Sequence, residues 1–165
     1  VCLVEQNDWT NEDWSEKGDI SELKHIFSDW HPEIQEILES TKPGSLFKWG
    51  LHDRAPMNKW SKGRFSLLGD AAHPMLPFVA QGAAMAIEDG IVLASSLSSF
   101  DNVALGLNDY ENKRKYRTAK AQRTATRNAT IFHLSDFFAI FRNLVMKFFI
   151  KKIMDSFYKY DAISK

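Results

Sequence analysis

The sequence predicts an α/β fold on three observations. The short, mostly apolar run at 65–68 stops at Gly69, which is typical of a buried strand that ends in a tight turn. A second segment, 46–52, alternates its side chains well enough to predict another strand. Beyond Gly82, apolar residues recur at spacings of three and four, which is the period of an amphipathic helix. The first half therefore supplies strands and the second half long helices.

Composition bounds the class of protein. With 165 residues, the chain has the length of one domain with room for a core, and its 44% hydrophobic and 25% charged residues are ordinary for a soluble globular protein. The formal net charge is zero, which implies no general attraction to nucleic acid or acidic membranes. The single cysteine, Cys2, excludes an internal disulfide and indicates a reducing compartment, the cytoplasm. The longest apolar stretch, 137–150, carries Arg142 and Lys147 and is too short to span a bilayer, which needs about 20 residues.

The elements before the strand at 65–68 follow from local signals. Asp19 is placed to cap a helix that runs through Phe27, and Pro32 suits the first position of a second helix that ends near Ser40. The remaining expectations are a strand at 1–5, a loop at 7–18, the strand at 46–52 and a connection at 54–63.

Three helices are expected after it. The first, 82–98, should bury one apolar face, formed by Ala83, Ile87, Ile91, Ala94 and Leu97. Asp101 is a good cap for a further helix that Gly106 interrupts early, and a long polar helix follows at 108–133. A final helix, capped by Ser135 or Asp136, carries an apolar stripe of Phe137, Phe141, Leu144, Val145 and Phe148. That stripe is compatible with core packing, a subunit contact or a membrane-surface helix, and packing is the usual role of such spacing.

The segment after the strand at 65–68 combines two ligand-binding features. Asp70 lies just past the end of the strand, at the edge of an open sheet where ligands collect. Small residues then open the helix at Gly82, Ala83 and Ala84, where backbone amides point outward without partners. A carboxylate accepts from hydroxyl groups and a helix N-terminus favours negative charge, so the pair suits a polyhydroxylated, partly anionic ligand. The alternatives are an aspartate that bonds its own turn and an ordinary helix start.

The run GDAAHPMLPFVAQGAAMAIEDG at 69–90 resembles the second flavin motif of the single-component FAD-dependent aromatic hydroxylases, such as salicylate hydroxylase and 3-hydroxybenzoate 6-hydroxylase. Further pieces that agree lie between residues 1 and 133, namely Trp30-His31-Pro32, Asp53-Arg54-Ala55-Pro56, Trp60 before Gly63-Arg64, and Tyr110-Glu111 leading into Arg117-Thr118. The chain lacks the Gly-x-Gly-x-x-Gly turn that this family carries near its N-terminus. We therefore expect the C-terminal part of a longer enzyme, with the end of a substrate-binding domain at 1–60, the second half of a Rossmann-like FAD-binding domain at 61–100 and a helical region at 101–165.

The resemblance implies a cofactor and a reaction. It implies that Asp70 binds the ribityl chain of FAD, that Pro77 lies against the ring system, and that amides at Gly82, Ala83 and Ala84 face the pyrimidine edge. The implied activity is a monooxygenase in which NAD(P)H reduces FAD and O2 forms a flavin C4a-hydroperoxide that hydroxylates a small, hydroxylated aromatic acid. No catalytic residue is assigned, the substrate-binding residues are unknown, and a homodimer is left open. An epoxidase or oxidase on the same scaffold is the alternative.

Other candidate chemistry is weaker. His73 is more often a structural hydrogen bonder than a catalytic group, and the remaining histidines lack metal-ligand spacing, so no metal is expected. Glu88 and Asp89 are adjacent on a helix, which favours structural roles. The chain has no Gly-x-Ser-x-Gly, which argues against a hydrolase. Seven basic residues make the helix at 108–133 a candidate nucleic-acid or nicotinamide-phosphate surface, although a solvated face is the simpler interpretation: Lys113, Arg114, Lys115, Arg117, Lys120, Arg123 and Arg127. No aromatic residue on that face could stack bases, so we expect no nucleic-acid partner.

Overall fold

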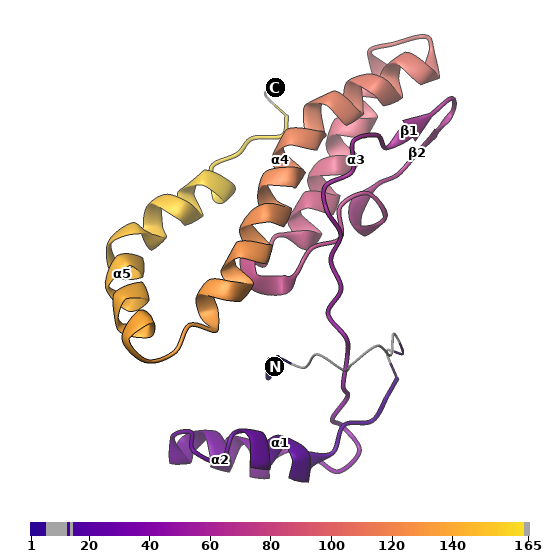
Figure 1. Cartoon of the computed structure of the whole chain (residues 1–165). Coiled ribbons are helices and arrows are strands. Elements are labelled where there is room, and N and C mark those ends of the chain that lie inside the picture. Colours follow the sequence, from indigo (N-terminus) through magenta and orange to yellow (C-terminus); the bar gives the residue numbers. More distant parts are fainter. Residues whose placement is uncertain (6–12, 14, 164–165) are drawn as a thin grey trace. The chain divides into compact units, whose positions relative to one another are not determined.

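The computed structural model describes residues 1–5, 13 and 15–163, and it divides into two compact units, Val1–Leu51 and His52–Lys165. Each unit is described by itself below. Most of the predicted loop at 7–18 lies outside the described residues. Taken together the described residues are mostly helical, with a small sheet in the second unit, which is consistent with the α/β class (Figure 1).

The first unit is built on two short helices, α1 (Ile20–Ile26) and α2 (Pro32–Glu39), both close to the predicted positions. Asp19 caps α1 by accepting a hydrogen bond from the backbone N–H of Ser21 at 2.8 Å. Phe27 is buried and meets the ring of Trp30 edge-on.

The strands predicted for this unit are wrong in extent. Residues 1–5 form no strand, and the segment at 46–52 pairs only through an isolated antiparallel bridge between Lys17 and Phe47. Alternating side chains favour an extended backbone, but a strand also needs a neighbour that supplies ladder hydrogen bonds. Within the described ranges, these segments have almost none.

The second unit begins with an antiparallel hairpin of β1 (Ser61–Lys62) and β2 (Phe65–Ser66). Two 3-10 turns follow, η1 (Gly69–Ala71) and η2 (Pro77–Val79), and lead into α3 (Gly82–Ser98). Helices α4 (Val103–Phe132) and α5 (Asp136–Tyr158) complete the unit. The predicted strand at 65–68 therefore pairs over two residues only, whereas α3 begins and ends where the sequence predicts.

Helices α3 and α4 lie side by side (Figure 1). Asn102, rather than Asp101, caps α4 by accepting from the N–H of Ala104 at 2.9 Å. Gly106 does not interrupt the helix, which runs without a break from Val103 to Phe132. Its lack of a side chain instead allows α3 to approach closely, since a Cβ there would lie 3.2 Å from Cα of Leu97. The glycine is therefore a close-approach residue inside one continuous helix.

The predicted buried face of α3 is wrong. The residues that α3 buries are Met85, Asp89, Val92 and Ser96, whereas Ile87 is 67% exposed and Ile91 40% exposed. The buried face includes polar groups because α4 supplies partners for them, as when Ser96 Oγ donates to Asp109 Oδ2 at 2.7 Å. Apolar spacing identified the helix but not the face that its neighbour covers.

Side chains of α4 hold the rest of the second unit together. Glu111 Oε2 accepts from the backbone N–H groups of Trp60 and Ser61, at 3.0 and 2.9 Å. Further along the helix, Gln122 Nε2 donates to the carbonyls of Arg54 and Pro74, both at 3.0 Å. The first strand and the loop before α3 are thus both tied to this one helix.

Helix α5 contributes Phe157 to the core formed with Val79, Met85, Ala121 and Ala125. Its predicted apolar stripe is exposed, from 38% at Val145 to 74% at Phe137. Among the described residues, no helix is both long and apolar enough to cross a bilayer.

Candidate functional site

The residues from Gly69 to Gln81, here called the motif loop, connect β2 to α3 and carry the first predicted ligand group. Gly69 is buried with φ of +59°, a backbone conformation that favours glycine, and a Cβ there would lie 3.3 Å from that of Ala86. Asp70 follows it and is exposed. No described residue donates a hydrogen bond to the Asp70 carboxylate, so this side chain does not close its own turn.

The N-terminus of α3 carries the other predicted groups. Its cap residue, Gln81, makes no side-chain hydrogen bond to the helix, and its carbonyl accepts from Met85 N–H at 2.8 Å. The N–H groups of Gly82, Ala83 and Ala84 come before that bond, in the first turn, where an α-helix offers no acceptor. A Cβ on Gly82 would meet no heavy atom within 4 Å, so space is open beside this end of the helix.

Pro77 begins η2, one turn ahead of α3, and is exposed. The turn ends at Ala80, whose φ of 51° is left-handed for a residue other than glycine. Asn128 of α4 supports the turn by donating from Nδ2 to the carbonyl of Phe78 at 3.0 Å. Asp70 and Pro77 are therefore both exposed on the motif loop, which packs against α3 through η1 and leads into the helix end formed by Gly82–Ala84.

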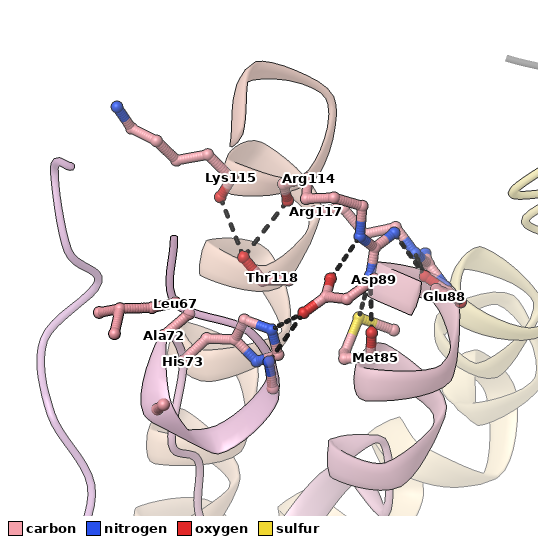
Figure 2. Close-up of polar contacts among 12 residues, drawn as sticks. Leu67, Ala72, His73, Met85, Glu88, Asp89, Arg114, Lys115, Arg117 and Thr118 are labelled. Carbon is pink, nitrogen blue, oxygen red and sulfur yellow. Dashed lines mark hydrogen bonds and ion pairs between the residues drawn. The ribbon is translucent and has the colours of Figure 1, made fainter. Parts of the chain in front are cut away.

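Behind the motif loop, Asp89 joins three segments of the chain (Figure 2). Its Oδ2 accepts from the backbone N–H of Gly69 at 3.0 Å and lies 2.6 Å from Nε2 of His73. Its Oδ1 accepts from Nε of Arg114 on α4 at 2.7 Å. The side chains of Asp89, His73 and Arg114 are all fully buried.

Arg114 also binds Glu88, the neighbour of Asp89 on α3. Arg114 Nη1 donates to Glu88 Oε2 at 2.7 Å, and Arg117 donates to both oxygens of the same carboxylate at 2.7 and 2.6 Å. His73, Glu88, Asp89, Arg114 and Arg117 therefore form one ion-pair cluster, which fixes the motif loop to α3 and α4. Such bidentate, charge-assisted bonds are strong and directional.

Hydrogen bonding decides the charge states in this cluster. Burial alone would raise the pKa of the Asp89 carboxyl, but the bonds from His73, Arg114 and Gly69 outweigh it and lower that pKa below its ordinary value. Burial likewise opposes the charge of Arg114, and its bonds to Asp89 and Glu88 raise its pKa above the ordinary value. Asp89 and Arg114 are therefore a charged pair at neutral pH.

His73 has the structural role that the sequence favours. Its ring packs against Trp60 at 5.5 Å between centroids, and its buried Nδ1 has no hydrogen-bond partner among the described residues. The ring of Tyr110 also contacts Trp60, at 5.8 Å between centroids, and Tyr110 donates to the carbonyl of Leu67 at 3.3 Å. Burial, reinforced by the charge of Asp89, raises the pKa of the Tyr110 phenol above its ordinary value, so Tyr110 stays a neutral donor.

The basic helix is only partly the solvated face that the sequence favours. Arg114 is fully buried and Arg117 nearly so, whereas Arg123 and Arg127 are exposed. The sequence placed Arg114 only on a candidate basic surface, not in a buried ion pair, and it predicted no structural role for Glu111 or Gln122. The available signal was the pair of adjacent acids, Glu88 and Asp89, on an otherwise apolar helix, which called for a cationic partner. No group of three or more His, Cys, Asp or Glu side chains within the described ranges lies close enough to hold a metal ion.

Comparison with known proteins identifies relatives of this chain in sequence and in structure. The chain is 44% identical over 120 residues to 6-hydroxynicotinate 3-monooxygenase of Pseudomonas fluorescens, which covers 72% of the chain and 30% of that protein. It is 34% identical over 156 residues to 3-hydroxybenzoate 6-hydroxylase of Klebsiella oxytoca, over 94% of the chain and 37% of the relative. Among solved structures, HpxO of Klebsiella pneumoniae in complex with FAD and uric acid matches with a TM-score of 0.75 and 26% identity, over 84% of this chain and 37% of HpxO.

The chain thus spans about a third of the length of the curated relatives it matches. The relatives confirm the resemblance to aromatic hydroxylases inferred from the run at 69–90. Residues 4–125, which include the motif loop, α3 and most of α4, match the family described as FAD binding domain. The chain therefore belongs to the FAD-binding domain family.

Proposed function

We propose that this chain is part of an FAD-dependent monooxygenase that hydroxylates a small aromatic acid, using NAD(P)H and O2. The support is the family, together with relatives named as monooxygenases and hydroxylases of aromatic acids. In this proposal residues 1–60 belong to the substrate-binding domain, 61–100 to the FAD-binding domain and 101–165 to a helical region.

One observation carries the FAD assignment. The exposed carboxylate of Asp70, without a donor from any described residue, lies on a turn that packs against α3, whose first amides also lack helical acceptors. These groups fit FAD: the carboxylate accepts from ribityl hydroxyls, and Gly82, Ala83 and Ala84 present N–H groups to an electron-rich edge. Pro77 offers an apolar surface to a ring system.

Bound FAD would supply the redox chemistry that links NAD(P)H to O2. The residues of this chain would hold the cofactor in place and stabilise negative charge on it. The positive end of the α3 dipole stabilises negative charge near the N–H groups of Gly82–Ala84. The ion-pair cluster behind the motif loop keeps Asp70 and Pro77 in place, and contacts with the rest of the enzyme exclude water from the reacting centre.

The test replaces Asp70 in the complete polypeptide that carries this chain. Asp70→Ala removes a charged acceptor, a loss of about 1.5–3 kcal/mol, so FAD affinity should fall about tenfold to a hundredfold. Flavin absorbance after dialysis measures retention, and Asp101→Ala, at another exposed aspartate, is the matched control. Flavin retention that is equal in the two variants would contradict the assignment.

Two further features belong to this proposal. The protein works in the cytoplasm, in keeping with its one cysteine, Cys2, which is exposed and free.

The protein also forms a homodimer in this proposal, through the exposed stripe of α5, where Phe137, Phe141 and Phe148 are each more than 60% exposed. Sedimentation of the complete polypeptide tests the dimer: Phe141→Glu should yield monomers, and an unchanged mass would overturn that contact.

A further inference from the structure

A groove on α4 remains outside the site described above. It has a volume of about 550 Å³, is open to solvent, and lies between the extended segment at 53–56 and one face of the helix. Pockets for small ligands span about 300–1,000 Å³. Its lining residues are Asp53, Ala55, Pro56, Gln122, Arg123, Thr126, Arg127 and Thr130.

Charge is the first clue to an occupant. Arg123 and Arg127 are one helical turn apart, both are exposed, and neither makes an ion pair or hydrogen bond with a described residue. The groove contains one carboxylate, that of Asp53, which already accepts from Thr126 Oγ1 at 2.8 Å. Two arginines with unused N–H groups make the groove cationic and suited to bidentate binding of phosphate.

The remaining lining fits the rest of a nucleotide. Ala55 and Pro56 give the groove an apolar wall, on which the flat face of a base can lie. The guanidinium groups of Arg123 and Arg127 can also stack on the aromatic ring of such a base. The second oxygen of Asp53 is free to accept from ribose hydroxyls, as acidic residues do in dinucleotide sites.

The groove also adjoins the motif loop. Gln122 lines the groove and donates to the carbonyl of Pro74, inside that loop, at 3.0 Å. The same amide donates at 3.0 Å to the carbonyl of Arg54, which lies between the lining residues Asp53 and Ala55 in the sequence. A ligand in the groove would therefore lie next to the loop that carries Asp70 and Pro77.

We propose that this groove binds the diphosphate of the pyridine dinucleotide, through Arg123 and Arg127. The proposal rests on the proposed monooxygenase function and adds the place where its reductant docks. An open groove suits a co-substrate that enters and leaves in every cycle, whereas the aromatic substrate needs an enclosed site that excludes water.

The test measures equilibrium binding in the complete polypeptide loaded with FAD. ADP-ribose is the probe, because it carries the diphosphate but lacks the nicotinamide ring and so cannot reduce FAD, and calorimetry gives its Kd. Arg123→Ala and Arg127→Ala should each weaken binding about tenfold, and the affinity of the wild type should fall as salt rises. Arg64→Ala, at an exposed arginine outside the groove, is the control and should leave Kd unchanged.

Two results would overturn the proposal. One is an ADP-ribose Kd that stays within twofold of the wild type in the double variant Arg123→Ala/Arg127→Ala with its FAD content intact. The other is a loss of FAD in that double variant, because the arginines would then belong to the flavin site. A wild type that purifies and reconstitutes without FAD would instead count against the proposed function, and ADP-ribose binding could still be measured on it.

Discussion

Replacing Arg114 by methionine tests the central packing claim, that one buried guanidinium joins the motif loop, α3 and α4. Arg114 is fully buried and donates to Asp89 at 2.7 Å, to Glu88 at 2.7 Å and to the carbonyl of Met85 at 3.2 Å. Breaking a buried pair by removing one partner costs about 3–5 kcal/mol. We expect the lower end, about 3 kcal/mol, because Asp89 keeps two donors and Glu88 keeps Arg117.

Thermal unfolding followed by far-UV circular dichroism measures this loss. For a chain of this length, about 3 kcal/mol lowers Tm by about 6–12 °C. Lys113→Met is the matched control on the same helix, because its i,i+4 ion pair with Asp109 is partly exposed and such helix pairs are worth about 0.3–0.5 kcal/mol. If Arg114→Met and Lys113→Met unfold within about 2 °C of each other, the cluster does not hold the unit together.

Three further predictions follow from other contacts. The folded-state pKa of Asp89 is lowered, so the wild type should be more stable than Asp89→Asn by its full margin above about pH 4, and this margin should shrink only below that pH, as the carboxyl protonates. Urea unfolding of both proteins at pH 7, 5 and 3 measures the margin, and a margin already absent at pH 5 would contradict the lowered pKa. Gly106→Ala should lower Tm, because its Cβ would press on the backbone of α3, whereas Gly90→Ala, with open space, should gain about 1 kcal/mol from helix propensity; the same sign for both would count against the close approach. Ala80→Gly should stabilise by about 1 kcal/mol by relieving its left-handed backbone, and a lower Tm would refute that.

Local signals in the sequence were sufficient for helices α1, α2 and α3, but they misplaced the cap and the start of α4. Pro32 begins α2 and Asp19 caps α1 as expected, and α3 runs over 82–98 as predicted. These features depend on residues within one turn of each other, so the chain carries them wherever it folds. The same locality explains why the motif at 69–90 was sufficient to indicate the family.

The strands and the buried face of α3 could not be predicted in this way. The segment at 46–52 alternates as a strand should, but it forms only one bridge, because ladder hydrogen bonds depend on a partner elsewhere. Ile87 has the spacing of a core residue and is exposed, while Asp89 is buried. Hydrophobic periodicity identifies the most apolar face of a helix. It does not indicate that an opposite charge on the neighbouring helix, here Arg114 on α4, allows a face that contains a carboxylate to be buried.

The sequence by itself determined helices α1 to α3, the Asp19 cap and the glycine-aspartate turn with its small-residue helix start, because each depends on neighbours along the chain. Only the tertiary structure decided that Asp89 and Arg114, 25 positions apart, share a buried ion pair, and that Arg123 and Arg127 have no such partner among the residues the structure describes. Burying a charge is favourable only where the fold delivers an opposite charge at hydrogen-bonding distance, and that distance is a property of packed helices rather than of residue order.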